Sequence, residues 1–348
     1  MLVCKIKKHL RGFSLDVNLT AKHGVTALMG ASGSGKSMTL RCIAGVSKPD
    51  EGRIELNGVT LFDSEKKINL PPQKRNAGFL FQDSALFPNM TARQNIMAGA
   101  KHKPRRERQA AAVELAEVFR VSPHLDKYPH ELSGGEKQRC ALARIMAGAP
   151  DILMLDEPFS ALDSHLRWEL ELELAAAFKR FAKPVIYVSH NRDEIYRLCG
   201  DIAVIDRGKS EAACDKWKLF ENPQTVQAAR LTGCKNIVAA DVEGGRVFVS
   251  DWGIEFDLCN ARDGIRHVGI RANHIIPASI APKEEIAAAF PFEIVSEIED
   301  TFTNILMVRK QGTDLPAIRW EMRKKEREEL RELPQELALL HKHILLLN

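Results

Sequence analysis

The chain has 348 residues, of which 45% are hydrophobic and 28% charged, and its formal net charge is +4. This length allows two domains, and the composition is that of an ordinary globular protein, not a disordered or fibrous one. The small net charge predicts no basic surface for nucleic acid. No run approaches the roughly 18–20 apolar residues that cross a bilayer, and the first residues lack the apolar core of a secretory signal.

In the first half of the chain, short apolar runs alternate with helical patterns, which predicts a parallel sheet covered by helices. Three runs predict strands, at Val25–Met29, Ile152–Leu155 and Val185–Val188, and a helix is expected over about Ser37–Ala44. Ligands on such sheets lie at the carboxyl ends of the strands. Because all three runs end in polar groups, we expect these groups to meet in one crevice.

A helical segment is expected between these strands, over about Thr91–Ala149. It is interrupted by the basic run Lys101–Arg108, which favours a solvated helix face or turn over a nucleic-acid patch. The seven cysteines are scattered without a CxxC pair. This pattern favours buried thiols in a reducing compartment over a metal or redox site.

The pattern changes near Asn222-Pro223, and from about Asn236 short alternating runs predict a small β-barrel. Within it, the tetrapeptide 243–246 (EGGR) predicts a two-residue hairpin turn, because paired glycines tolerate positive φ angles. One charged helix is expected over about Glu321–Arg331.

The segment 30–37 (GASGSGKS) matches the phosphate-binding loop G-x4-G-K-[ST] and stands between a predicted strand and a predicted helix. The glycines let backbone N–H groups point at phosphate oxygens, aided by the helix N-terminus. We expect Lys36 to reach the β- and γ-phosphates and the Ser37 hydroxyl to bind Mg²⁺. The expected nucleotide contacts here are Gly30, Ala31, Ser32, Gly33, Ser34, Gly35, Lys36, Ser37 and Met38.

Two adjacent carboxylates, Asp156 and Glu157, end the strand predicted at Ile152–Leu155. Asp156 is suited to hold Mg²⁺ through water. Glu157 is then available to polarise the water that attacks the nucleotide. Acids at strand ends are common, but together with a complete phosphate-binding loop they predict a nucleotide hydrolase that uses ATP and Mg²⁺.

The segment Leu132–Arg139 (LSGGEKQR) resembles the signature sequence of ATP-binding-cassette (ABC) ATPases, and it precedes the acidic pair as in that family. Ser133, Gly134 and Gly135 at a helix start form a second potential anion cradle. In the family each nucleotide lies between the phosphate-binding loop of one subunit and the signature of another. The resemblance therefore implies a head-to-tail dimer of two copies of this chain.

The resemblance extends over about residues 1–230 and implies roles for further residues. Gln82 matches the glutamine that senses Mg²⁺ and the attacking water near the membrane-subunit contact. Asp163, in SALD, matches the loop that crosses the dimer interface, and His190 matches the histidine that contacts the γ-phosphate. Phe13 is the candidate for stacking on adenine, although its place in RGFSLDV also fits a core-facing strand residue.

The stretches 24–37 and 68–88 and the β-rich tail resemble importers of molybdate and, more loosely, of sulfate. This implies an ATP-hydrolysing subunit on the cytoplasmic face of the membrane, with integral membrane permease subunits and, indirectly, an external solute-binding protein. Sulfate, iron, polyamines or sugars are alternative cargoes. A cassette ATPase acting on ribosomes or DNA usually carries two cassettes or a long coiled-coil insertion, and this sequence shows neither. A non-hydrolysing regulator is expected to lack Glu157, Lys36 or His190, and all three are present.

In that group of importers the tail is an OB-like barrel that dimerises the subunits and, in some members, binds the transported oxyanion. Here an anion has four candidate partners, Arg266, His267, Arg271 and His274, and an exposed polar strand face is the alternative. We therefore expect an α/β phosphate-loop cassette over 1–231, with a helical subdomain at about 91–149. A C-terminal barrel for regulation or dimerisation is expected over 232–348.

Overall fold

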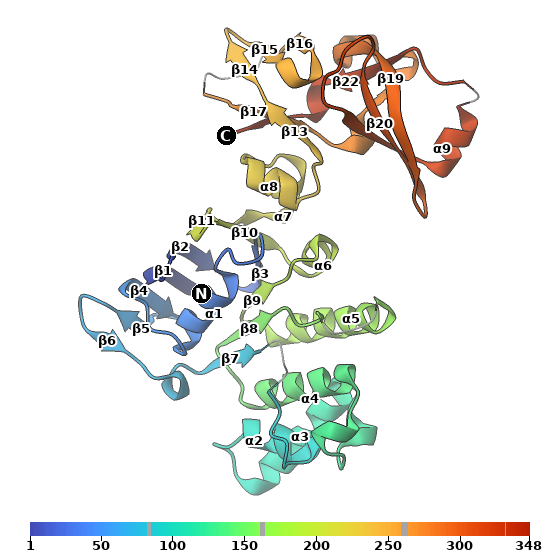
Figure 1. Ribbon diagram of the computed structural model, residues 1–348. Coiled ribbons are helices and arrows are strands. Elements are labelled where there is room, and N and C mark those ends of the chain that lie inside the picture. The colour runs from blue at the N-terminus through green and yellow to red at the C-terminus, as the bar shows by residue number, and fades with distance from the viewer. Residues whose placement is uncertain (82–84, 161–163, 259–263, 331) are drawn as a thin grey trace. The chain divides into compact units, whose positions relative to one another are not determined.

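The chain forms two compact units in a computed structural model, Met1–Lys216 (the N-terminal unit) and Trp217–Asn348 (the C-terminal unit) (Figure 1). No helix among the residues described here has the length and apolar character needed to span a membrane. The structure describes residues 1–81, 85–160, 164–258, 264–330 and 332–348.

The division between the units falls before the boundary that we expected after Leu231. The reason is the packing of α8 (Val226–Leu231), whose Ala229 shares an apolar cluster with Leu345 and Leu347 near the end of the chain. The last residue, Asn348, also donates its backbone N–H to the Gln224 carbonyl at 3.1 Å. The helix before it, α7, covers Lys216–Glu221.

The centre of the N-terminal unit is a parallel sheet with the strand order β10-β3-β9-β8-β7. The three apolar runs that predicted strands form β3, β8 and β9, as expected. Every residue of β8 and β9 is buried, which is the pattern of strands covered on both faces. The strands are β3 (Gly24–Met29), β7 (Ala77–Leu80), β8 (Ile152–Asp156), β9 (Pro184–Val188) and β10 (Asp201–Asp206).

An antiparallel layer extends this sheet, and the sequence analysis did not anticipate it. Its order is β6-β5-β4-β1-β2, with β11 joining β2 to β10 and β12 pairing with β10. Strand β2 alternates between buried and exposed residues, as expected of a sheet with one covered face. The strands are β1 (Leu2–Leu10), β2 (Phe13–Ala21), β4 (Glu51–Leu56), β5 (Val59–Asp63), β6 (Ile68–Asn69), β11 (Lys209–Ser210) and β12 (Cys214–Asp215).

Helices account for the rest of the N-terminal unit (Figure 1). Three of them fall in the segment expected to be helical, and the basic run becomes an exposed turn followed by the start of a helix after Pro104. The helices are α1 (Lys36–Ala44), α2 (Ala92–Gly99), α3 (Arg105–Val118), α4 (Gly134–Ala147), α5 (Ser164–Phe181) and α6 (Arg192–Leu198), with 3-10 turns at Pro72–Lys74, Ser122–His124 and Pro129–Glu131. Among the described cysteines of both units, Cys214 is half-buried and the others are buried free thiols.

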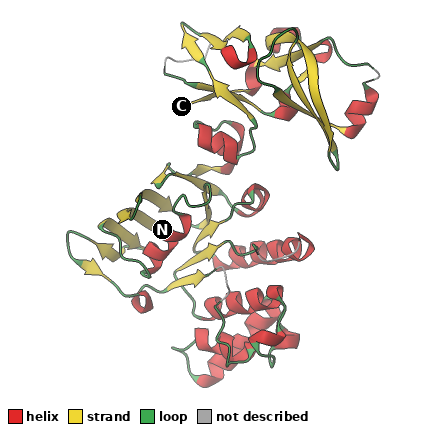
Figure 2. Cartoon of the chain, viewed as in Figure 1, coloured by secondary structure: helices red, strands yellow, loops and turns green. Residues whose placement is uncertain are grey.

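The C-terminal unit consists of curled antiparallel sheets around one apolar core that includes Trp252, Phe290 and Trp320 (Figure 2). Among the described residues the sheet orders are β13-β17-β23, β14-β15-β16 and β18-β22-β19-β20-β21. The strands are β13 (Asn236–Ala239), β14 (Asp241–Glu243), β15 (Arg246–Val249), β16 (Ile254–Asp257), β17 (His267–Ile270), β18 (Ile276–Pro277), β19 (Ile286–Glu299), β20 (Thr303–Lys310), β21 (Ile318–Arg323), β22 (Glu336–Leu340) and β23 (Ile344–Leu347).

The hairpin turn predicted in this unit is confirmed. Gly244 and Gly245 have φ angles of 59° and 87° and connect β14 to β15, where Glu243 pairs with Arg246.

The charged helix is shorter than expected. It forms α9 (Lys324–Glu329), whereas Glu321 belongs to β21. The alternating Ile318, Trp320 and Met322 are buried in the core, which holds this segment as a strand paired with β20.

Candidate functional site

The phosphate-binding loop connects the carboxyl end of β3 to the start of α1. Gly35 caps α1 with a φ of 108°, in a region that favours glycine. Gly30 is needed for a different reason, because a Cβ atom there would lie 2.3 Å from the Ile205 carbonyl oxygen. The loop backbone is therefore curled in a way that larger residues at these two positions would prevent.

The Lys36 ammonium group lies within the curl of this loop. Its Nζ donates to the carbonyl oxygens of Gly30 at 2.9 Å and Ala31 at 2.8 Å, and the residue is 6% exposed. Burial lowers the pKa of Lys36, while the nearby carboxylates of Glu157 and Asp156 act in the opposite direction. The loop thus holds a buried cation beside two acids.

The Ser37 hydroxyl donates to Asp156 Oδ1 at 3.0 Å, which joins the first turn of α1 to the end of β8. Asp156 is 8% exposed, and burial raises its pKa against the lowering effect of this hydrogen bond. A hydroxyl and a carboxylate are hard oxygen donors of the kind that Mg²⁺ prefers. The pair therefore fits a Mg²⁺ ion.

Glu157 directly follows β8 and has a φ of 48°, which is unusual for a residue with a side chain. Its N–H donates to the Val188 carbonyl at 2.9 Å, and its own carbonyl accepts from Ser160 Oγ at 3.1 Å. Backbone conformations of this kind are found at functional sites, where the surrounding structure imposes them.

His190 follows β9, and its Nδ1 lies 3.3 Å from Glu157 Oε2. The His190 side chain is 67% exposed and that of Glu157 is 27% exposed. The structure therefore brings together Lys36, Ser37, Asp156, Glu157 and His190, which the sequence analysis had selected from three separate strand ends.

The remaining loop residues differ in exposure. Ala31 and Ser32 are exposed, whereas Ser34 is buried and its Oγ has no hydrogen-bond partner among the residues that the structure describes. The Met38 side chain is partly buried against the core, and a nucleotide contact from this residue stays a prediction. The sequence analysis missed Thr39, whose hydroxyl donates to the Gly35 carbonyl at 2.9 Å and supports the end of the loop.

Phe13 begins β2 and is partly buried against the core. Its ring also lies beside the phosphate-binding loop, because Cζ is 3.3 Å from the position of a Cβ atom on Gly35. Both alternatives considered for Phe13 therefore remain, and adenine stacking stays a prediction.

The signature segment begins α4, with Ser133 as its N-cap. The Ser133 N–H donates to Glu136 Oε2 at 2.8 Å, and the Glu136 N–H donates to Ser133 Oγ at 3.3 Å. Gly134 and Gly135 form the first turn. Figure 1 shows α4 grouped with α2 and α3, away from α1 of the same chain.

Two other expected site residues, Gln82 and Asp163, lie outside the described residues.

Comparison with known proteins shows the family. A sequence model described as "ABC transporter" matches residues 14–160. The molybdenum import ATP-binding protein of Rhizobium johnstonii is 33% identical over 292 residues, covering 83% of this chain and 78% of that protein. The chain belongs to the ABC transporter family.

Other relatives are similar over a smaller share of the chain. The molybdenum import ATP-binding protein of Paramagnetospirillum magneticum is 42% identical over 223 residues, 64% of this chain and 61% of its own length. The chain thus spans less than two thirds of that relative. A solved dimeric ATP-binding cassette in a post-hydrolysis state, bound to ADP and Pi, is 28% identical with a TM-score of 0.54, and covers 62% of this chain and 98% of its own.

The segment Ala85–Met90 is held by two side chains of this ABC cassette that sequence analysis missed. Asn95, which is fully buried in α2, donates to the carbonyls of Phe87 at 3.1 Å and Met90 at 3.0 Å. Arg144, in the last turn of α4, donates to the Ala85 carbonyl at 2.9 Å and lies over the Phe87 ring. A buried polar residue within an amphipathic helix, such as Asn95, was the one available signal.

The four candidate partners of an anion in the C-terminal unit differ in their contacts and exposure. The Arg271 guanidinium donates to the carbonyls of Thr232, at 2.7 Å, and Phe220. The His274 ring lies 4.0 Å from the His343 ring, and burial lowers the pKa of His274 to about 4. Arg266 is exposed and His267 is half-buried. Packing within this unit therefore already engages Arg271 and His274, and an anion site at these four residues stays a prediction.

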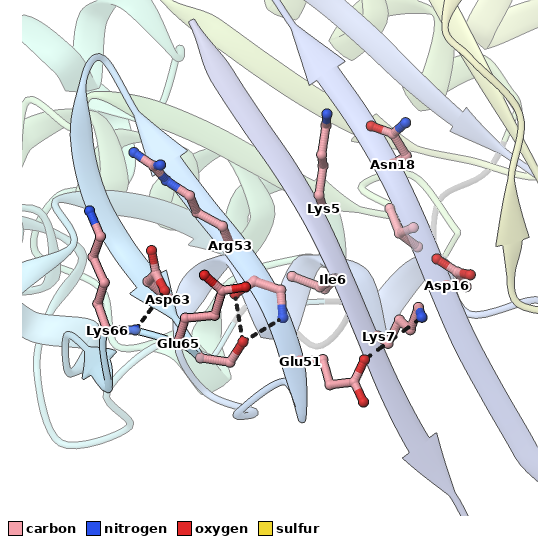
Figure 3. Close-up of a pocket in the computed structure, with 13 residues that line it drawn as sticks. Lys5, Ile6, Lys7, Asp16, Asn18, Glu51, Arg53, Asp63, Glu65 and Lys66 are labelled. Atoms are coloured by element: carbon pink, nitrogen blue, oxygen red, sulfur yellow. Dashed lines mark hydrogen bonds and ion pairs between the residues drawn. The ribbon is translucent and has the colours of Figure 1, made fainter.

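A cavity of about 760 Å³ lies on the antiparallel layer and is lined by charged side chains, among them Lys5, Lys7, Glu51 and Arg53 (Figure 3). Lys7 Nζ is 3.7 Å from Glu51 Oε2 across β1 and β4. No residue of the phosphate-binding loop lines this cavity. It is the solvated face of the sheet and is distinct from the nucleotide site.

Proposed function

We propose that this chain is the ATP-hydrolysing subunit of a membrane importer for molybdate or a related oxyanion. The observation that carries the proposal is the pairing of Glu157 with His190 beside the phosphate-binding loop, with Nδ1 and Oε2 3.3 Å apart. A phosphate-binding loop alone would support nucleotide binding. A carboxylate and an imidazole next to it support hydrolysis.

Each residue of the site has a distinct task in this proposal. The loop N–H groups and Lys36 bind the β- and γ-phosphates of ATP. Glu157 accepts a hydrogen bond from a water and polarises it for attack on the γ-phosphorus, which breaks the bond to the bridging oxygen and yields ADP and phosphate. His190 donates a hydrogen bond to the γ-phosphate and lies against Glu157.

Ser37 and Asp156 are the residues suited to hold Mg²⁺, and Gln82 is proposed as a further ligand. When bound, Mg²⁺ neutralises charge on the phosphate oxygens. In the protein itself, the 3.0 Å hydrogen bond between Ser37 and Asp156 keeps the two donors adjacent. The positive charge of Lys36 also acts to lower the pKa of Asp156, against the effect of burial.

The site is proposed to be completed by a second copy of the chain. Ser133, Gly134 and Gly135 lie at the N-terminus of α4 in a group of helices separate from α1, so they are available to a nucleotide held by another chain. The dimeric arrangement of the solved ATP-binding cassette supports this. Asp163 is proposed to lie at the same interface.

A permease is proposed to dock on the segment that Asn95 and Arg144 hold. Phe81, Phe87 and Met90 are 37%, 47% and 38% exposed, an unusual set of large apolar side chains for a solvated surface. Docking there would place the chain on the cytoplasmic face of the membrane, with an external solute-binding protein acting on the permease.

The cargo assignment comes from the printed names of the relatives, which are molybdenum import ATP-binding proteins. Import of sulfate, iron, polyamines or sugars is the alternative. The C-terminal unit, which supplies none of the five convergent side chains, is proposed to dimerise the subunits or regulate them.

The test is Glu157→Gln, which keeps the shape of the side chain and removes its charge. We expect Mg-ATP binding to persist and hydrolysis to fall at least about 100-fold, within the range of general-base catalysis. Cells that depend on this importer should also stop accumulating molybdate. Glu51→Gln is the control, because that side chain is 62% exposed and lines a cavity to which no residue of the phosphate-binding loop contributes. Near-normal hydrolysis by Glu157→Gln would contradict the mechanism. If hydrolysis falls as expected but cells still accumulate molybdate, the assignment of molybdate as the cargo is contradicted.

A further inference from the structure

A buried carboxylate, Glu194, lies next to the proposed catalytic histidine but outside the proposed reaction. It is in the first turn of α6 and is 3% exposed. Its Oε2 accepts hydrogen bonds from the Ser189 hydroxyl at 2.7 Å and the Tyr187 hydroxyl at 3.1 Å. The first of these bonds ties Glu194 to the residue immediately before His190.

The Ser189 hydroxyl also acts as an acceptor, for the N–H of Asn191 at 3.0 Å. Because the hydroxyl proton is donated to Glu194, the oxygen lone pairs face Asn191 and the direction of both bonds is set. The Asn191 side chain in turn accepts from the N–H groups of Asp193 and Glu194. His190 therefore lies between two residues whose positions depend on Glu194.

Glu194 also faces α5. Arg167 Nη1 lies 3.6 Å from Glu194 Oε1, and Arg167 Nη2 donates to the Phe159 carbonyl at 3.4 Å. Phe159 follows Glu157 by two positions. The carboxylate is thus connected on one side to the backbone around His190 and on the other to the backbone just after Glu157.

We propose that Glu194 is a positioning residue that orients His190 toward Glu157. The His190 ring is mostly exposed, and its one ion-pair contact among the described residues is with Glu157. Packing therefore does little to orient the ring, and its direction follows from the backbone of residues 188–191 that Glu194 holds. This inference rests on the proposed function, because it requires Glu157 and His190 to act on the nucleotide.

A second buried acid provides a matched control. Glu171 is 3% exposed on α5 and its Oε2 lies 2.7 Å from Arg197 of α6. This pair joins the same two helices as Arg167 and Glu194. Ser189 and Asn191 form their side-chain hydrogen bonds with other residues. Loss of the Glu171–Arg197 pair should therefore weaken the packing of α5 on α6 and leave the histidine in place.

The experiment compares four variants of the full chain: Glu194→Gln, Ser189→Ala, Glu171→Gln and His190→Ala. ATP affinity, kcat and Tm are measured for each. Misplacing a reacting group by about 1 Å can cost about 100-fold in rate. We therefore expect Glu194→Gln and Ser189→Ala to lower kcat about 10- to 100-fold with KM for ATP changed less than about threefold. Glu171→Gln should lower Tm by a similar amount to Glu194→Gln and leave kcat unchanged.

Ser189→Ala keeps the pair of Glu194 with Arg167 and removes the hydroxyl that bonds both to Glu194 and to the Asn191 N–H. It therefore tests the inference even if Glu194→Gln does not fold. Equal losses of kcat in Glu171→Gln and Glu194→Gln, or normal kcat in Ser189→Ala, would overturn the inference. His190→Ala separates this failure from that of the proposed function. If His190→Ala hydrolyses ATP normally, the proposed function fails, whereas a large loss in His190→Ala with normal Ser189→Ala rejects only the role of Glu194.

Discussion

Substitution of Arg75 by methionine is expected to destabilise the N-terminal unit by about 4 kcal/mol. Arg75 is 1% exposed and precedes β7. Its guanidinium donates four hydrogen bonds of 2.8–2.9 Å, and two of the acceptors are the last carbonyls of α1, the helix that begins at the phosphate-binding loop. The four acceptors are the Leu70, Cys42 and Ile43 carbonyls and Asn69 Oδ1.

The magnitude follows from what Arg75→Met leaves behind. Two of the four bonds, those to the Cys42 and Ile43 carbonyls, are buried. A hydrogen bond from a charged group contributes about 1.5–3 kcal/mol, so the loss of these two costs about 3–6 kcal/mol. The upper limit is not expected, because burial of the guanidinium itself costs free energy and lowers the pKa of Arg75.

The assay is urea unfolding followed by hydrogen exchange of peptides from α1 and from β20. Each unit needs its own probe, because a chain of two units does not have to unfold in one step. Arg53→Met is the control, since the Arg53 side chain is 51% exposed, and its effect should stay within about 0.5 kcal/mol. A loss below about 1 kcal/mol in Arg75→Met, or an equal loss in Arg53→Met, would refute the reasoning.

Two further predictions concern the phosphate-binding loop and the C-terminal unit. Gly35→Ala should weaken Mg-ATP binding at least about tenfold in a fluorescent-nucleotide titration, because φ is 108° and the new Cβ would lie 2.5 Å from Leu15 Cδ1. Gly58→Ala, with a φ of 84° and nothing within 4 Å, should keep normal affinity. The pKa of His274 is lowered from 6.5 to about 4, so the C-terminal unit should lose stability as pH falls from 6.5 towards 4, where the unfolded chain binds a proton that the folded one excludes. An NMR titration of His274 in the unchanged protein should show this pKa, and a pKa near 6.5 would contradict the prediction. In His343→Asn the pKa of His274 should rise, because the charge of His343 also lowers it.

Local patterns determined much of this protein. The phosphate-binding loop, the acids after β8 and the histidine after β9 were all identified from segments of fewer than ten residues, because each combines a buried apolar run with the polar residues that follow it. The Gly244-Gly245 turn was predicted for the same kind of reason, since its positive φ angles depend on the residues themselves.

The remaining features depend on partners that are distant in the sequence. Whether Glu321 belongs to a helix or a strand was decided by pairing of its strand with β20, not by its own charged neighbours. The sequence made Arg271 a candidate anion ligand, whereas in the structure its guanidinium donates to the Thr232 carbonyl at 2.7 Å. Nothing in the sequence indicates that Arg75 and Glu194 are buried, since both are single charged residues among many.

Burial explains this difference. A charged side chain is normally solvated, and nothing in its local sequence indicates that packing will remove it from water. Once Glu194 is 3% exposed, its charge must be met by hydrogen bonds and by Arg167, and those contacts tie together segments around His190 and Glu157. The sequence alone therefore determined which residues carry the proposed chemistry, and only the tertiary structure decided which buried groups hold them in place.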